Sequence, residues 1–284
     1  MNNPSILIFG NCQGEHIGEV ARYMPSLRER FDIKIVALHL VTPQDWETRF
    51  TPAFFEGVQV VWNQVESGEP SEHRKMLESR IPRGCQIVTY PPLSMLCLWP
   101  FSGADPRQAE RTDDVYPWAD SIAASLACED LTDDALFERY MRLSTEKMPD
   151  LTRRLRIDAM RGRATDGLAD IQMWDWVEAN FRSRRLFYTS SHLTALPVAH
   201  LLTQLLERTA CLTATAILRA KQEMAFLLRR YRGQDVEMVP IHPLVAERLE
   251  LTWYDPDERH RWHGHAWTYR EYLSKYIRWE PYLR

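Results

Sequence analysis

Four short apolar runs in the first third of the chain constrain the fold more than any other sequence feature. They occupy residues 5–9, 33–40, 58–62 and 84–90, and each is continuous rather than alternating. Continuous apolar strands separated by helical segments are typical of a parallel sheet that is covered on both faces. The sequence therefore predicts an α/β fold with a small open parallel sheet of about five strands flanked by helices.

From residue 116 onward the pattern changes to a large, mostly helical central and C-terminal part. Amphipathic helical patterns occupy residues 119–128, 133–143, 150–160 and 171–182, and further helices are expected at residues 196–206, which are apolar, 215–232 and 268–277. Residues 185–189, Arg-Leu-Phe-Tyr-Thr, look like one returning strand. We expect a single domain over residues 1–284, mostly α/β in residues 1–115 and mostly helical in residues 116–284.

Charge and composition exclude several classes of partner. The 284 residues carry a formal net charge of -4, so no global basic field attracts nucleic acid or an anionic membrane. The apolar runs are too short to span a bilayer, and the first residues lack the basic and apolar regions of a signal peptide. We expect a cytoplasmic protein with no nucleic-acid partner and no membrane span.

The five cysteines indicate neither a disulfide framework nor a zinc site. They lie far apart in the sequence and form no Cys-x-x-Cys pair. Four of them lie in apolar surroundings and are most simply core residues. Cys12 differs because it directly follows the first predicted strand, in Gly10-Asn11-Cys12-Gln13.

This turn after the first strand is the leading candidate for a functional site, because ligands of open parallel sheets bind at the carboxyl ends of the strands. A helix N-terminus lowers the pKa of a thiol, which makes Cys12 a candidate nucleophile. Asn11 and the backbone amides from Gly10 to Gln13 are candidate oxyanion donors. The alternative is that Gly-Asn is an ordinary turn dipeptide and Cys12 a small buried residue.

A nucleophile of this kind needs a base, and His192 is the best placed of the nine histidines. It follows the predicted strand at 185–189 and precedes a helix, so we expect it at the same sheet edge as Cys12. Asp120 is a candidate for orienting the imidazole, as the third member of a triad. The alternative is that Asp120 caps a helix, which is the more common role of an acid at a helix start.

The C-terminal part offers a rival pair of groups. Asp257 and His260 have the Asp-x-x-His spacing by which some serine esterases deliver acid and base from one loop, although the stretch is equally well a polar surface loop. His263 and His265 lie nearby, but no His-Glu-x-x-His helix and no paired cysteines accompany them. We therefore expect no metal.

Two stretches carry a resemblance to a known family. Residues 8–13 read Ile-Phe-Gly-Asn-Cys-Gln, and residues 174–189 read Trp-Asp-Trp-Val-Glu-Ala-Asn-Phe-Arg-Ser-Arg-Arg-Leu-Phe-Tyr-Thr. With these stretches the chain resembles the WcbI family of capsule-polysaccharide biosynthesis proteins, which are regarded as acetyltransferases that bind coenzyme A. In the family the second block runs into Asn-His-Pro, whereas this chain has Ser191-His192-Leu193. This chain therefore has the family's histidine, but it has serine in place of the family's asparagine.

The resemblance implies acetyl transfer from acetyl-CoA to a sugar hydroxyl in capsule or surface-polysaccharide biosynthesis. The partners would be a small-molecule acyl donor, coenzyme A in its acetylated form, and a sugar or polysaccharide-precursor acceptor. Because coenzyme A carries phosphates, Arg182, Arg184 and Arg185 are candidate cofactor-binding cations, with Ser191 as a further contact. Two alternatives stay open: an SGNH-like esterase that uses the same strand-turn site, and a non-enzymatic scaffold for glycan assembly.

Overall fold

The computed structural model describes residues 3–109, 116–229, 234, 236–280 and 282. The chain divides into two compact units. The first unit comprises Met1–Leu93, Arg161–Val177 and Leu193–Gly233, and the second comprises Ser94–Met160, Glu178–His192 and Gln234–Arg284. Neither unit is one continuous stretch of sequence, so the division differs from the change in character at residue 115, where no domain boundary was expected. The expectation that residues 1–284 form a single domain stays a prediction.

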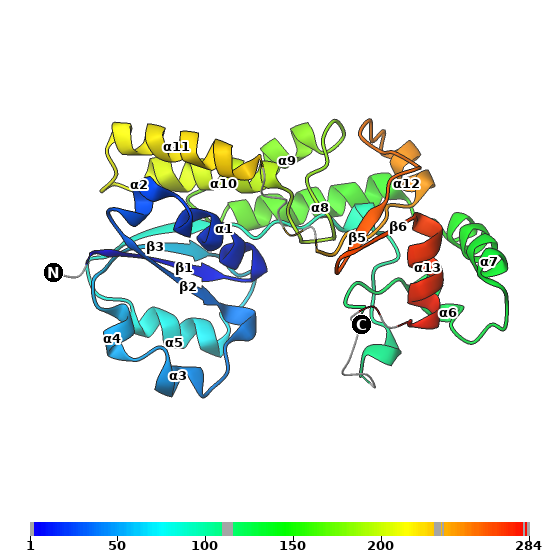
Figure 1. Ribbon diagram of the computed structural model, residues 1–284, viewed down its shortest axis with the longest axis horizontal. Coiled ribbons are helices and arrows are strands. Elements are labelled where there is room, and N and C mark those ends of the chain that lie inside the picture. The colour runs from blue at the N-terminus through cyan, green and yellow to red at the C-terminus, as the bar shows by residue number, and fades with distance from the viewer. Residues whose placement is uncertain (1–2, 110–115, 230–233, 235, 281, 283–284) are drawn as a thin grey trace. The chain divides into compact units, whose positions relative to one another are not determined.

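A four-stranded parallel sheet forms the centre of the first unit (Figure 1). Its strands, in the spatial order β2-β1-β3-β4, are β1 (Ser5–Gly10), β2 (Asp32–Ala37), β3 (Val58–Gln64) and β4 (Gln86–Tyr90). They coincide with the four predicted apolar runs, and the α/β fold class is confirmed. Because β2 and β3 lie on opposite sides of β1, the topological switch point falls at the carboxyl ends of β1 and β3, where such sheets bind ligands.

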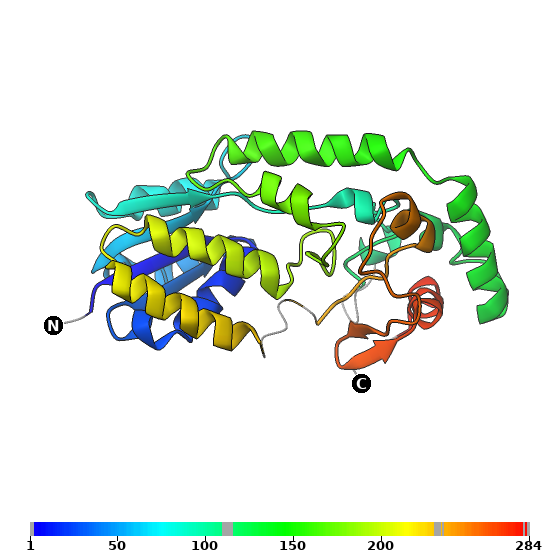
Figure 2. The same ribbon diagram turned by 90° about the horizontal axis from the view of Figure 1, so that it is seen from above.

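Helices of the first unit cover both faces of this sheet (Figure 1). One face carries α1 (Cys12–Arg22), α2 (Pro25–Arg28), α10 (Ala195–Arg208) and α11 (Ala214–Leu228), of which α10 and α11 lie side by side (Figure 2). The other carries α3 (Asp45–Thr48), α4 (Pro52–Phe55) and α5 (Glu72–Arg80). On that face Trp46, Phe50 and Leu77 pack in one buried cluster with side chains of β1 and β3. Residues 230–232 of the helix expected at 215–232 lie outside the described residues.

The prediction of a returning strand at residues 185–189 is wrong. This segment is a loop in which Tyr188 donates its backbone N–H to the carbonyl oxygen of His192 (2.8 Å). In the sheet, Thr89 on β4 donates its backbone N–H to the carboxylate of Asp170 (2.8 Å), so this edge group is already satisfied without a fifth strand. The apolar character of residues 185–189 reflects burial in a core rather than strand pairing.

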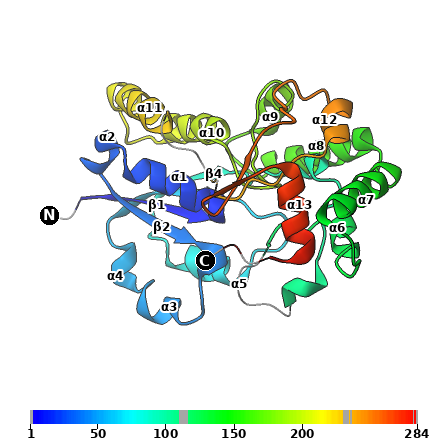
Figure 3. The same cartoon turned by 45° about the vertical axis from the view of Figure 1, so that its right-hand side comes forward.

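The second unit contains helices and one small hairpin. The helices α6 (Ser121–Ser125), α7 (Asp133–Glu146) and α13 (Tyr269–Arg278) pack together (Figure 3), and α12 (Pro243–Arg248) also belongs to this unit. Two helices, α8 (Leu151–Asp166) and α9 (Trp174–Asn180), contribute residues to both units. No helix within the described residues has the length and apolar character that a bilayer crossing requires.

Aromatic side chains form the core of the second unit. The ring of Tyr116 lies 5.4 Å from that of Trp262 and 5.1 Å from that of Tyr282, measured between centroids. Trp262 belongs to an antiparallel hairpin of β5 (His260–Trp262) and β6 (His265–Trp267), which was not predicted from the sequence. The hairpin turn has φ angles of 44° at His263 and 91° at Gly264. Two successive positive φ angles are the mark of the tight turns that join hairpin strands.

Acidification is expected to destabilise the second unit through two buried histidines. Burial lowers the pKa of His242 to about 4, and burial together with the charge of Arg185 lowers that of His260 to about 3. The unfolded chain therefore binds protons on these imidazoles below pH 6.5 while the folded unit does not, so stability is full above pH 6.5 and is lost toward pH 4. The loss reaches roughly 3 kcal/mol per histidine.

We predict a fall in Tm between pH 6.5 and pH 4 that is smaller in His242→Asn. Asparagine keeps an acceptor for the backbone N–H of Leu244, which His242 accepts at 3.1 Å at the start of α12, but it does not titrate. Differential scanning fluorimetry across this pH range measures the difference. An equal fall in both proteins would assign the pH dependence to other groups.

Candidate functional site

The turn between β1 and α1 is the candidate site of the first unit. Gly10 ends β1, Asn11 is the N-cap of α1, and Cys12 is the first helical residue. The side chain of Asn11 accepts a hydrogen bond from the backbone N–H of Gln13 (2.9 Å), as N-cap residues commonly do. The half-buried thiol of Cys12 therefore lies at the N-terminus of an 11-residue helix.

Two buried glutamines hold this turn against the ends of the neighbouring strands. Gln64, the last residue of β3, accepts a hydrogen bond from the N–H of Asn11 (2.8 Å) and donates one to Oε1 of Gln13 (3.3 Å). The amide of Gln13 also exchanges two hydrogen bonds with the backbone of Leu93, at 2.6 and 2.9 Å. The side chain of Gln13 thus stabilises the fold, and at 1 % exposure it does not reach the surface.

Gly10 allows Gln64 to approach the turn closely. A Cβ atom at Gly10 would lie 2.6 Å from Oε1 and 2.7 Å from Cβ of Gln64. A Cβ atom at Gly14, in the first turn of α1, would lie 2.7 Å from the hydroxyl of Tyr90 on β4. Both approaches require glycine, and together they fix the N-terminus of α1 at the switch point of the sheet.

The oxyanion donors expected at this turn need a correction. The backbone N–H groups of Asn11 and Gln13 are already donated, to Gln64 and to the side chain of Asn11 respectively. A donor that is already paired inside the fold is not available to a developing oxyanion. Because Oδ1 of Asn11 faces the helix, its Nδ2 points the other way, and within the described residues it has no hydrogen-bond partner. Nδ2 of Asn11 is therefore a candidate donor in place of these two backbone groups.

His192 belongs to the second unit, in the loop that replaces the expected strand. The loop is held by Thr189, whose fully buried hydroxyl accepts the backbone N–H groups of Ser191 (3.4 Å) and His192 (3.0 Å). Cys12 belongs to the first unit. Because the expected strand is missing, the two groups do not follow strands of one sheet, and the pairing of Cys12 with His192 stays a prediction.

Glu237 is the acid that the structure places beside His192. Its Oε2 accepts a hydrogen bond from the indole N–H of Trp118 (2.6 Å) and lies 3.9 Å from Nδ1 of His192. Its Oε1 lies 3.0 Å from Nε2 of His263. The side chains of Glu237 and His192 are only 15 % and 18 % exposed, so their interaction is weakly screened by water. A fixed carboxylate beside an imidazole is an arrangement suited to acid-base chemistry.

Asp120, named from the sequence for this orienting role, has a different one. Its Oδ1 accepts the backbone N–H groups of Ile122 and Ala123 at 2.9 Å each, which caps α6, and its Oδ2 accepts the hydroxyl of Tyr140 at 2.8 Å. Burial raises the pKa of this carboxyl group. The structure thus gives Asp120 the capping role that was the alternative, and gives the place beside His192 to Glu237.

The three candidate arginines differ in their surroundings. Arg185 forms an ion pair with Glu258 and lies over the ring of Trp253, with its guanidinium carbon 4.7 Å from the ring centroid. Its charge is therefore already matched. The guanidinium carbon of Arg182 lies 4.4 Å from the ring centroid of Phe181, and Arg184 is exposed. Of the three, Arg182 and Arg184 are better suited to meet a phosphate.

The rival pair of Asp257 and His260 does not form an exposed acid-base site. Asp257 is exposed, whereas His260 begins β5 with only 6 % of its surface exposed. Of the other two histidines in this part, His263 contacts Glu237, and His265 contacts the carbonyl oxygen of Tyr282 (2.9 Å). Among the residues that the structure describes, no three His, Cys, Asp or Glu side chains are grouped so as to hold a metal ion.

Comparison with known proteins places these features in a family. The family described as polysaccharide biosynthesis enzyme WcbI matches residues 5–212. The chain belongs to the WcbI family of polysaccharide biosynthesis enzymes. Both stretches that carried the resemblance, residues 8–13 and 174–189, lie inside the matched range, whereas Glu237 lies beyond it. None of the curated proteins matches the sequence at a significant level.

A solved structure of WcbI shares the fold. It is described as a novel polysaccharide biosynthesis enzyme, in the native form without a disulfide bond between coenzyme A and a cysteine. The two proteins are 15 % identical, with a TM-score of 0.73 over 98 % of this chain and 90 % of that chain. At this identity the likeness concerns the WcbI fold and not the site residues.

We predict that Gly10→Ala lowers the free energy of unfolding of the first unit by about 2 kcal/mol, because Gln64 must move away from the added methyl group. Gly167→Ala is the control, since a Cβ atom there meets its nearest atoms at ordinary distances of 3.4 and 3.5 Å. Urea unfolding followed by tryptophan fluorescence measures both. Equal midpoints for the two variants would contradict the role assigned to the contact with Gln64.

Proposed function

We propose that this protein transfers an acetyl group from acetyl-CoA to a sugar hydroxyl during synthesis of a capsule or another surface polysaccharide. Membership of the WcbI family supplies the setting of polysaccharide biosynthesis. The observation that carries the proposal is the thiol of Cys12 at the capped N-terminus of α1, beside the switch point of the sheet. The description of the WcbI structure, which names coenzyme A together with a cysteine, supports the same ligand for this chain.

In the proposed reaction His192 takes the proton of the acceptor hydroxyl, whose oxygen attacks the thioester carbonyl of acetyl-CoA. A tetrahedral intermediate forms with an oxyanion, which N–H donors stabilise. The carbon–sulfur bond then breaks, coenzyme A leaves as its thiolate, and the proton held by the imidazole neutralises it. The products are the acetylated sugar and coenzyme A.

Glu237 is proposed as a positioning residue in this reaction. Its carboxylate faces Nδ1 of His192, and both of its oxygens are held, one by Trp118 and the other by His263. An acid held in this way orients the imidazole and stabilises the positive charge that the ring acquires when it takes a proton. The remaining ring nitrogen, Nε2, is then the one assigned to the acceptor hydroxyl.

The cofactor phosphates are assigned to the arginines of residues 182–185. We propose Arg182 and Arg184 as the contacts, with Ser191 as a further polar contact, and we leave Arg185 to its ion pair with Glu258. A cytoplasmic location is part of the proposal, because the donor is a cytoplasmic metabolite. No metal is assigned a role in the reaction.

We predict saturable binding of coenzyme A and acetyl-CoA in calorimetric titrations. Cys12→Ala should weaken binding about tenfold, equivalent to about 1.4 kcal/mol. Cys128→Ala should not change it, because Cys128 is exposed and not the core residue that the sequence led us to expect. Under oxidising conditions a disulfide bond between coenzyme A and Cys12 is expected. Mass spectrometry should therefore find coenzyme A attached to the Cys128→Ala variant but not to the Cys12→Ala variant. No heat at millimolar ligand would overturn the proposal and favour the esterase or the scaffold.

We predict that Glu237→Gln lowers kcat for acetyl transfer on the order of 10- to 100-fold without changing the Kd for acetyl-CoA. Glu146→Gln, at an exposed glutamate on α7, is the control and should leave kcat unchanged. Release of coenzyme A in the presence of a pool of sugars, followed by chromatography, measures kcat. If Glu237→Gln weakened acetyl-CoA binding and left kcat intact, its positioning role would be excluded.

A further inference from the structure

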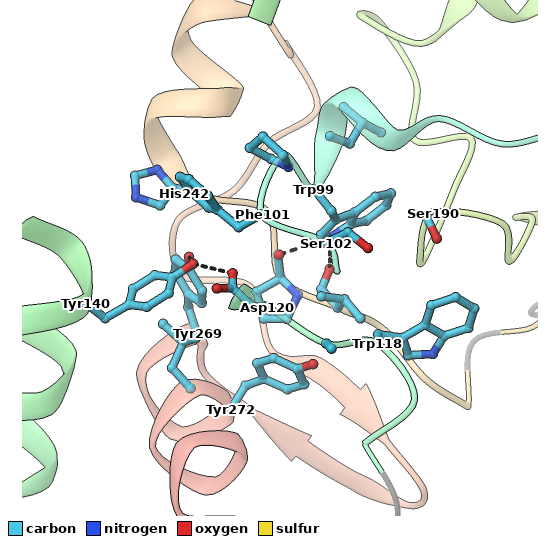
Figure 4. A pocket seen from close by; sticks show the side chains of 16 residues that line it. Trp99, Phe101, Ser102, Trp118, Asp120, Tyr140, Ser190, His242, Tyr269 and Tyr272 are labelled. Atoms are coloured by element: carbon cyan, nitrogen blue, oxygen red, sulfur yellow. Dashed lines mark hydrogen bonds between the residues drawn. The ribbon is translucent and has the colours of Figure 1, made fainter. Parts of the chain in front are cut away.

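The second unit contains a pocket to which the reaction proposed above assigns no role (Figure 4). The cavity has a volume of about 40 Å³. Aromatic side chains make up much of the wall, among them Trp99, Phe101 and Trp118. A cavity of this size has room for a small group, such as one edge of a larger ring, but not for a whole ring.

Polar side chains with hydrogen-bonding capacity also line this pocket. Oδ2 of Asp120 accepts one hydrogen bond, from Tyr140, and a carboxylate oxygen can accept a second. The hydroxyl of Tyr272, in a side chain only 3 % exposed, has no hydrogen-bond partner among the described residues. The hydroxyls of Ser102 and Ser190 lie at the same pocket. A buried hydroxyl without a partner is uncommon unless a ligand or a water molecule satisfies it.

The charge of the lining selects between kinds of ligand. All the residues that line the pocket are described, and none of them is lysine or arginine, while Asp120 is acidic. The phosphates of coenzyme A need cations, so this lining does not suit them. A neutral, hydroxyl-rich ring suits it well, because its hydroxyls can bond to Asp120 and the serines while its C–H faces pack against aromatic rings.

The pocket adjoins the proposed base. Trp118 forms part of its wall and meets the imidazole of His192 edge-on, with ring centroids 4.8 Å apart. The indole N–H of Trp118 is held by Glu237, and Ser190 lies two residues before His192 in the same loop. A ring bound in the pocket would therefore have one side near His192.

We infer that this pocket is the acceptor site and that it receives one edge of a neutral sugar ring. Asp120 accepts a hydrogen bond from a sugar hydroxyl, and Trp118 packs against the ring beside His192. The inference rests on the proposed function for the reaction that follows, but the binding itself does not require that function. This assigns to Asp120 a contact with the acceptor in place of the triad role.

Binding is tested without catalysis. The indole N–H resonances of Trp99 and Trp118 are followed by NMR during titration with uncharged methyl pyranosides that cover both epimers at each ring carbon. We expect at least one sugar to shift these resonances saturably. Asp120→Asn, which keeps a good N-cap, should weaken that binding about tenfold. Ser102→Trp, at the exposed opening, should abolish it, whereas Ser125→Trp, on an exposed part of α6 outside the pocket, should not.

Each outcome bears on the inference separately from the proposed function. Absence of any shift across the whole panel overturns the inference, as does equal weakening by Ser102→Trp and Ser125→Trp. Shifts caused by coenzyme A and lost in Ser102→Trp would make this the donor site and overturn it as well. The protein could bind a sugar, and lose that binding in Ser102→Trp, yet neither bind nor consume acetyl-CoA. That result would support the sugar site in the pocket and exclude the acetyltransferase proposal.

Discussion

The hydrogen bonds of Gln13 and Gln64 across the carboxyl ends of β1, β3 and β4 fix the turn on which the first candidate site depends. Both amides are nearly fully buried, at 1 % and 2 % exposure, and both pair with backbone groups as well as with each other. An apolar side chain in either position would leave the N–H of Asn11 or the backbone of Leu93 buried without a partner. The start of α1, and with it the thiol of Cys12, is therefore placed by a polar network rather than by apolar packing alone.

The two carboxylates of the second unit show how surroundings divide similar groups between roles. Asp120 accepts the first amides of α6 and the hydroxyl of Tyr140, and its partial burial raises its pKa. Glu237 is partly exposed and lies between the imidazoles of His192 and His263. A carboxyl group that is hydrogen-bonded to a helix N-terminus stabilises that helix and can also contact a ligand bound beside it. A carboxyl group beside imidazoles instead influences their protonation. Chemical type alone does not distinguish the two.

The sequence predicts the parts of the fold that repeat a local pattern. The four strands were found because continuous apolar runs bury both faces of a sheet, and the turn at Gly10 was found because a glycine ends the first run. Residues 185–189 were misassigned because Leu186 and Phe187 are apolar for core packing, which no local pattern separates from strand pairing. Glu237 was missed because its partners come from three distant segments. The hairpin had one usable signal, Gly264 after His263 between two tryptophan-containing runs.

The division of the chain has a consequence for its synthesis on the ribosome. The strands of the sheet all lie within the first 93 residues, but α10 and α11, which cover one face, begin only at Ala195 and Ala214. α1 and α2 cover part of that face early, but at ordinary translation speeds the remaining part waits on the order of ten seconds for α10 and α11. Until then the nascent chain leaves the uncovered part of the sheet exposed to solvent, where a chaperone can bind it or aggregation can begin.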